Sequence, residues 1–120
     1  MATQRAQDIA DGILKVSQNG RVWRASALSI EPSNGKGLSD YGILPSSWVR
    51  VLDIDAPSLV IRSYATPIAW RAASGTWRVP SERYSVTTSK HQGRVRAAIN
   101  LLGHQQREDD AIQQALDLVS

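Results

Sequence analysis

The sequence predicts an α+β domain: a mainly antiparallel sheet of about three hairpins, with two C-terminal helices packed on it. Short alternating apolar and polar runs separated by turn formers recur between residues 13 and 79. Two segments with apolar residues at helical spacing follow. The 120 residues are expected to form a single domain, in which 1–60 hold an N-terminal hairpin, a long loop and a strand, 61–103 a hairpin and a helix, and 104–120 a second helix.

The first hairpin is predicted around Asn19-Gly20. Asn-Gly between two alternating runs is the strongest short-range hairpin signal, and Ile13–Gln18 and Arg21–Ala25 are such runs. The alternative is one helix over Gln4–Ser17. Its apolar stripe would consist of Ile9, Ile13 and Val16. We prefer the hairpin, although the sequence leaves both structures open.

A long loop is predicted over residues 29–47, which are rich in Pro, Gly, Ser and Asn. Loops of this length in a small domain are usually functional or mobile. A strand over Trp48–Ile54, a turn, and a returning strand over Leu59–Tyr64 come next. The nearly continuous apolar run at the start of the returning strand places it centrally in the predicted sheet.

The third hairpin is predicted on both sides of the Gly-containing turn at residues 72–75. Alternation predicts that one face carries Ile68, Trp70, Trp77 and Val79, and that Arg71 and Arg78 share the other. The chain has four tryptophans and no phenylalanine. We therefore expect the tryptophans to supply the aromatic part of the core, with a stacking platform for single-stranded nucleic acid as the alternative.

Two helices are predicted at the C-terminal end. The first has an apolar stripe of Val95, Ala98, Ile99 and Leu102, and Gly103 is its expected stop. The second has a stripe of Ala111, Ile112, Ala115, Leu116 and Val119, with acidic residues near its start. We expect the two helices to form a helical hairpin across one face of the sheet.

Part of the chain resembles small proteins of unknown function encoded by phages and plasmids. These share a pattern like Tyr-x-Thr-Pro-Ile-Ala, a hairpin, and then Tyr-Ser-x-Thr-Thr-Ser-x-His. The pattern is carried here by Tyr64, Thr66, Pro67, Ile68, Ala69, Tyr84, Ser85, Thr87, Thr88, Ser89 and His91. The resemblance covers about a quarter of the chain, and it implies an origin in a mobile genetic element but no activity.

Positive charge is concentrated in the middle of the chain, although the net charge is only +3. The cations there are Arg62, Arg71, Arg78, Arg83, Lys90, Arg94 and Arg96, with Glu82 the single acidic residue between them. The hydroxyls of Thr87, Thr88 and Ser89, with Lys90 and His91, surround a predicted helix start, which suits a phosphate or a carboxylate. We predict that these residues form the binding surface; ordinary helix capping and a solvated arginine face are the alternatives.

The composition also excludes several classes. The chain has no cysteine, so disulfides, thiolate catalysis and cysteine zinc sites are excluded. No apolar run is long enough to span a membrane and no signal peptide is visible, so we expect a cytoplasmic location in the host cell. No metal spacing, nucleophile elbow or phosphate loop is present, and we expect neither a cofactor nor enzymatic activity.

Two functions remain. The first is a non-enzymatic accessory protein of a phage or mobile element that binds and inhibits a host defence complex, such as a CRISPR effector, through its basic surface and long loop. The second is a nucleic-acid-binding accessory protein that contacts phosphates through its arginine-rich hairpin and helix. The size and the resemblance favour the first.

Overall fold

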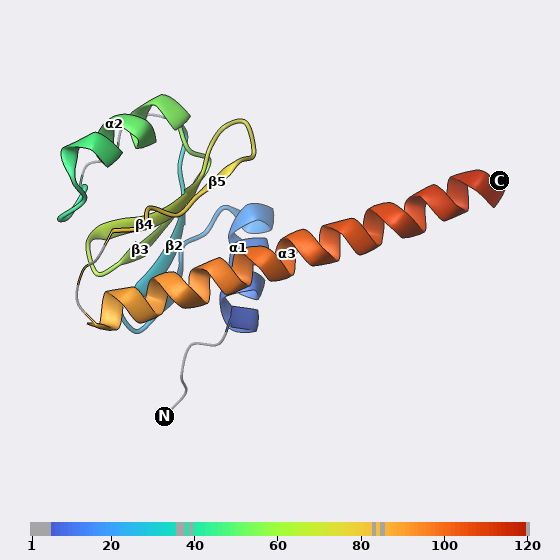
Figure 1. The fold of residues 1–120 in the computed structure, drawn as a ribbon, viewed down its shortest axis with the longest axis horizontal. Coiled ribbons are helices and arrows are strands. Elements are labelled where there is room, and N and C mark those ends of the chain that lie inside the picture. Colours follow the sequence, from blue (N-terminus) through green and yellow to red (C-terminus); the bar gives the residue numbers. More distant parts are fainter. Residues whose placement is uncertain (1–5, 36–37, 39, 83, 85, 120) are drawn as a thin grey trace.

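The chain folds into an α+β domain in the computed structural model, which confirms the predicted fold class (Figure 1). The structure describes residues 6–119 except 36–37, 39, 83 and 85. Its elements are α1 (Ala6–Asn19), β1 (Trp23–Ala25), β2 (Leu28–Pro32), α2 (Ser46–Asp55), β3 (Leu59–Ser63), β4 (Thr66–Arg71), β5 (Trp77–Arg78) and α3 (Val86–Val119). Helices α1 and α3 cover one face of the sheet, and α2 lies on the other.

The five strands form one antiparallel sheet in the order β1-β2-β3-β4-β5. The predicted returning strand is β3, and its predicted central position is confirmed. Ser63 pairs with Thr66, so β3 and β4 are joined by the tight turn Tyr64-Ala65. The β3–β4 register shifts between Ile61 and Arg62. This bulge changes which side chains of β4 face each side of the sheet.

The predicted N-terminal hairpin is wrong: residues 6–19 form helix α1, close to the helical alternative. Ile9, Ile13 and Val16 are buried as a stripe against the sheet. Gly20 adopts a φ of 68° and its N–H donates to Val16 O at 2.9 Å. Asn19-Gly20 therefore ends a helix, because a glycine in the left-handed region serves helix termini as well as hairpin turns.

The predicted strand over Trp48–Ile54 is also wrong, because Ser46–Asp55 form helix α2. Only Leu52 is fully buried from this helix, while Trp48, Val49 and Val51 are partly buried around it. The helix ends at Ala56, which has left-handed φ and ψ of 46° and 63° and donates its N–H to Leu52 O. The loop that was predicted over 29–47 begins later, since β2 extends to Pro32.

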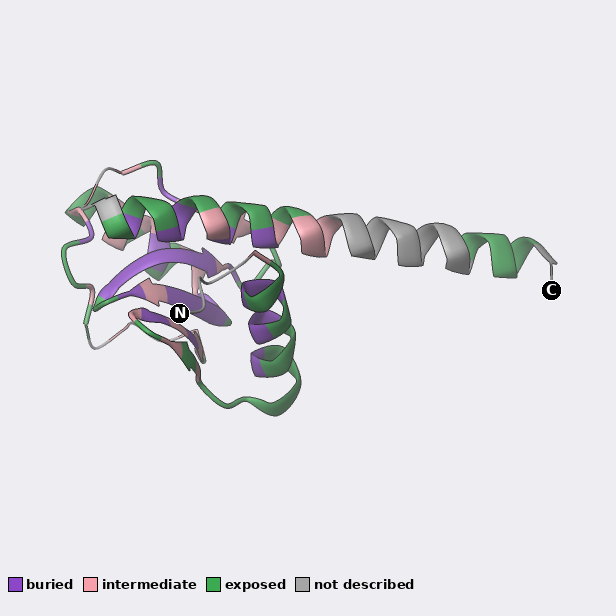
Figure 2. Cartoon of the chain, turned by 90° about the horizontal axis from the view of Figure 1, so that it is seen from below, coloured by how far each residue is buried: buried purple, intermediate pink, exposed green. Residues whose placement is uncertain are grey.

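The two predicted C-terminal helices are one. Helix α3 runs from Val86 to Val119 and passes through Gly103 without a break. Its first half packs on α1 and the sheet, whereas its second half projects away from the rest of the chain (Figures 1 and 2). A glycine inside a helix costs only about 1 kcal/mol relative to alanine, so it weakens a helix without ending it.

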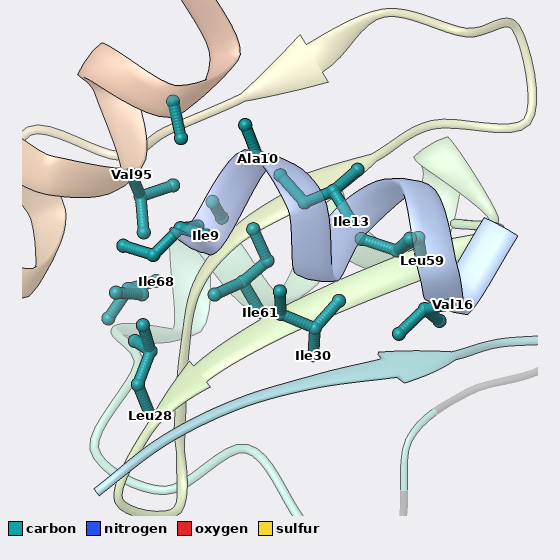
Figure 3. Close-up of a cluster of buried hydrophobic side chains, with 12 residues drawn as sticks. Ile9, Ala10, Ile13, Val16, Leu28, Ile30, Leu59, Ile61, Ile68 and Val95 are labelled. Carbon is teal, nitrogen blue, oxygen red and sulfur yellow. The ribbon is translucent and has the colours of Figure 1, made fainter. Parts of the chain in front are cut away.

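Each face of the sheet has its own apolar cluster. The larger one lies under α1 and α3 and consists mainly of aliphatic side chains, including Ile9, Ile13, Leu28, Ile30 and Ile61 (Figure 3). The smaller one lies under α2 and consists of Leu44, Leu52, Val60 and Trp70. The remaining tryptophans are partly buried against these clusters, as predicted for core aromatics.

The predicted faces of the third hairpin need correction, although its strands are confirmed as β4 and β5. Arg71 pairs with Trp77 and Trp70 pairs with Arg78, and residues that pair directly project to the same side. Trp70 belongs to the smaller cluster, whereas Ile68 joins the larger one because of the bulge. Arg71 and Arg78 therefore lie on opposite faces of the sheet.

Candidate functional site

Arg62 holds three parts of the chain together. Its Nε donates to Glu31 Oε1 at 2.8 Å, and its Nη1 donates to the carbonyl oxygens of Asp40 and Ala65, each at 2.6 Å. Only 11% of its side chain is exposed. Because its donors are used inside the protein, Arg62 fixes the loop after β2 to the β3–β4 turn and is poorly placed to contact a phosphate.

The other two predicted binding-site arginines on the sheet, Arg71 and Arg78, are also engaged. Arg78 Nε lies 3.0 Å from Asp55 Oδ2, which also accepts a hydrogen bond from Trp70 Nε1 at 2.9 Å. Arg71 lies over the Trp77 ring, 5.8 Å from its centroid. With Arg71 and Arg78 on opposite faces, the sheet does not form the continuous arginine face that the sequence predicted.

The predicted anion cluster is divided by the helix. Thr88 and His91 face inward, with 6% and 5% exposure. Thr87, Ser89 and Lys90 are exposed. The five residues therefore do not converge on one point, as a single phosphate would require.

Two of the remaining predicted cations, Arg94 and Arg96, lie on the same helix. Arg94 is half-buried, and Arg96 is exposed with its Nη2 3.4 Å from Pro80 O. Gln92 Nε2 donates to the same carbonyl at 3.1 Å. Gln92 and Arg96 also line a pocket of about 270 Å³, together with Ser81, Glu82 and Ser89. Arg83 lies outside the described residues.

A buried polar junction connects β3 to α3. Ser63 Oγ lies 2.7 Å from His91 Nδ1 and 3.2 Å from Thr88 Oγ1, and the imidazole tautomer decides which group donates to the other. Burial lowers the pKa of His91, and the nearby Arg94 lowers it further. His91 is therefore neutral at pH 7.

This junction is not arranged for nucleophilic catalysis. Ser63 is 1% exposed, and within the described contacts His91 has no carboxylate to orient it. A serine nucleophile needs access to substrate and a base held by a third group. The Ser63–His91 pair instead satisfies two buried polar groups where the strand meets the helix.

A pocket opens beside the junction. Its volume is about 300 Å³, at the lower end of the range for small-molecule sites. It is lined by Gly42, Ile43, Ser63, Tyr64, Ala65, Thr66, Tyr84 and Thr88. The lining comes from the loop after β2, the β3–β4 turn and the start of α3.

Two large apolar side chains of this lining are exposed. Ile43 is 70% exposed and Tyr64 is 63% exposed. Tyr64 also has a φ of 56°, a strained conformation for a residue with a large side chain. Strained residues with exposed side chains concentrate at binding sites, because the surrounding structure must hold them in place. We call Ile43, Tyr64 and Ala65 the pocket rim.

The loop is fixed against the turn by close contacts. Ile43 N donates to Thr66 Oγ1 at 3.0 Å. Gly42 has a φ of 56°, and a Cβ there would lie 2.7 Å from Thr66 Cα and 2.8 Å from Thr66 N. Tyr41 OH donates to Asp53 Oδ1 at 2.7 Å, which raises the pKa of Tyr41 and ties the same loop to α2. The rim is thus presented by a fixed loop.

The sequence did not identify Ser63, Ile43 or Gly42 as site residues. Their contacts join positions more than twenty residues apart, and no local pattern reports such a pairing. The signal that was available was the length of the predicted loop, which indicated a functional segment. Tyr64 and Thr66 were singled out only through the resemblance.

Among the residues that the structure describes, no group of three or more His, Cys, Asp or Glu side chains is placed to hold a metal ion. None of the described helices is long and apolar enough to cross a membrane.

Fold and site together define a small α+β protein with an apolar-rimmed pocket on its surface. The chain belongs to the family described as "Family of unknown function (DUF8033)", whose model matches residues 13–114. No curated protein and no solved structure matches it.

Proposed function

We propose that this protein is a non-enzymatic binding protein of a phage or mobile element that inhibits a host defence complex, and that it contacts its partner through the pocket rim. The observation that carries the proposal is the exposure of Ile43 and Tyr64 around a pocket of about 300 Å³. Exposed large apolar side chains beside a concave surface are typical of protein-binding sites.

The charges favour a protein partner over nucleic acid. Arg62 and Arg78 are held in ion pairs with Glu31 and Asp55. The surface therefore offers fewer phosphate contacts than the sequence suggested. The predicted role of the long loop is retained in this proposal, because Gly42 and Ile43 belong to it.

A pull-down from host lysate tests the proposal with matched variants. Ile43→Asp places a charge on the rim, and Tyr64→Gly removes the rim ring while suiting the backbone. Ile54→Asp is the control, because Ile54 is 82% exposed but lies on α2 and not in the pocket. We expect the wild type and the control to capture the same complex after nuclease treatment, and both rim variants to lose it.

Inhibition is measured separately, as the loss of defence activity in cells that express the protein. The rim variants should leave the defence system active, and Ile54→Asp should inhibit it like the wild type. Capture that is unchanged in both rim variants would contradict the proposed contact surface.

Nucleic-acid binding is the second candidate, and it is supported by the first turns of α3. Lys90 is exposed and Arg94 half-exposed, and neither has a carboxylate partner among the described residues. Binding to several phosphates would weaken steeply between about 50 and 200 mM salt. Lys90→Ala with Arg94→Ala should reduce it, whereas Arg78→Ala should change it little, since Arg78 is already paired.

A further inference from the structure

Tyr84 leaves one buried polar atom of the pocket lining without a partner. The residue forms part of the pocket wall, and its hydroxyl oxygen is buried and makes no hydrogen bond within the part of the chain that the structure describes. The great majority of buried polar groups in proteins are hydrogen-bonded, and an unpaired one destabilises the folded state. Such a group in a pocket wall indicates where a bound molecule forms its hydrogen bond.

The other buried hydroxyls of the lining are already engaged. Ser63 Oγ lies 3.2 Å from Thr88 Oγ1, and Thr66 Oγ1 accepts a hydrogen bond from Ile43 N at 3.0 Å. The phenol of Tyr84 is thus the buried hydroxyl of this lining that still has its hydrogen bond to offer.

The charges around the pocket favour an uncharged ligand. Among the described residues that line it, none carries a charge. Burial raises the pKa of the Tyr84 phenol above its usual value of 10.0, and the nearby Glu82 carboxylate raises it further. The phenol therefore keeps its proton at pH 7 and is available as a donor. A phosphate or carboxylate ligand is disfavoured, because a charge that leaves water needs a partner of opposite sign.

We propose that the pocket receives one uncharged, mainly apolar side chain of the partner protein, and that this anchor accepts a hydrogen bond from Tyr84 Oη. The inference rests on the proposed function, in which the partner is a protein. A volume of about 300 Å³ is small for a small-molecule site and suits a single anchoring side chain. Ile43 and Tyr64 are mostly exposed, so they change rotamer readily, and they turn aside as the anchor enters and reaches the hydroxyl.

Two probes of the same shape test the hydrogen bond. p-Cresol corresponds to the side chain of tyrosine, and p-xylene has a methyl group in place of its hydroxyl. In NMR titrations of the full chain we expect both to shift the amide signals of Ala65 and Thr66. Tyr84→Phe should weaken p-cresol binding by about threefold to tenfold and should not weaken p-xylene binding.

Three results of these titrations would overturn the proposal. The first is that neither probe shifts the two amide signals. The second is that Tyr84→Phe leaves p-cresol binding unchanged, or weakens both probes equally. The third is that 4-methylbenzoate, the charged probe, binds the wild type more tightly than p-cresol does.

The stability of the free protein gives an independent readout. Tyr84→Phe removes an unpaired hydroxyl, so the midpoint of thermal unfolding should stay the same or rise. Tyr41→Phe is the matched comparison, because Tyr41 OH donates to Asp53 Oδ1 and accepts from Leu38 N, and its loss should lower the midpoint. If Tyr84→Phe lowers the midpoint as much as Tyr41→Phe, the Tyr84 hydroxyl has a partner inside the folded chain and the proposal is wrong.

Capture from host lysate separates this inference from the proposed function. We expect Tyr84→Phe to reduce capture by about threefold to tenfold, whereas Ile43→Asp and Tyr64→Gly lose it. Full capture by Tyr84→Phe, with loss in the two rim variants, would reject the anchor and leave the proposed contact surface standing. Binding of p-cresol through Tyr84, with no complex captured by the wild type, would instead reject a protein side chain as the occupant.

Discussion

The buried cluster under α1 and α3 consists of aliphatic side chains, with the polar Ser63–His91–Thr88 junction where β3 meets α3. The face under α2 combines four buried apolar residues with a larger set of polar bonds. On the α2 side, the Asp55 carboxylate accepts hydrogen bonds from Trp70 and Arg78, and the Asp53 carboxylate accepts one from Tyr41. Arg62 on β3 donates to Glu31 of β2 and to the Asp40 carbonyl of the following loop. Aliphatic burial is strong but non-directional. Hydrogen bonds are weaker in net energy but fix orientation, and the pocket rim lies where they are concentrated.

Truncating one leucine on each face compares the two clusters directly. Leu28 and Leu52 are both fully buried, Leu28 in the larger cluster and Leu52 in the smaller. Leucine-to-alanine changes in cores cost about 2–5 kcal/mol, depending on how far the cavity collapses. We expect Leu28→Ala near the upper limit and Leu52→Ala near the lower, because α2 lies on the surface and can move inward. Urea denaturation measures both, and a larger loss for Leu52→Ala would contradict this account.

The contact between loop and turn is tested at two glycines. Gly42 and Gly75 both have positive φ, but a Cβ on Gly75 would meet nothing within 4 Å. Gly75→Ala should therefore cost only the conformational strain of about 1–2 kcal/mol. Gly42→Ala should add about 1–3 kcal/mol of overpacking against the Thr66 backbone, and it should also abolish partner capture. Equal stability losses for the two variants would show that the loop moves freely from the turn.

Asp55 is the polar centre of the α2 face. Asp55→Ala leaves the indole N–H of the buried Trp70 without its partner, which should cost about 1–3 kcal/mol. Arg78→Ala is the matched control. It should cost about 0–1 kcal/mol, since nearly half of the Arg78 side chain is exposed and solvent screens the ion pair. If thermal unfolding gives the two variants the same loss, the ion pair and not the indole bond carries the role of Asp55.

The smallest expected effect is a pH dependence at the Ser63–His91 junction. Folding lowers the pKa of His91 below its ordinary value of 6.5, mainly through burial. As the pH falls below 6.5, the unfolded chain binds a proton at this histidine more readily than the folded chain, so the free energy of unfolding decreases. His91→Gln should flatten this part of the pH profile, measured by denaturation between pH 7 and the folded pKa. An unchanged slope would assign the pH dependence to other groups.

Local patterns in the sequence were sufficient for some elements and misleading for others. The apolar run of β3 and the alternation on both sides of residues 72–75 predicted real strands and the centre of the sheet. The Asn19-Gly20 signal failed because its geometry also ends a helix. Trp48–Ile54 is rich in the β-branched and aromatic residues that strands favour, but it forms a helix whose Leu52 is buried in the cluster with Val60 and Trp70.

The candidate site was less predictable than the fold. Thr88 and His91 were identified, but as donors to an anion, and they are buried against Ser63 instead. The pocket requires the loop after β2 to meet the β3–β4 turn, and that contact joins residues far apart in the chain. Whether an arginine is free to bind a partner depends likewise on which carboxylate the fold places beside it.

The sequence by itself determined the fold class, the central strand, the aromatic composition of the core and the opposite charges of the two halves of α3. These properties follow from composition and short-range periodicity. Only the tertiary structure decided that Arg62 and Arg78 are bound internally and that the bulge between Ile61 and Arg62 separates Ile68 from Trp70. It also decided that the second half of α3 projects away from the rest of the chain, with Leu116 and Leu118 exposed. Each of these depends on which distant segments pack together, because packing fixes side-chain partners that local sequence leaves open.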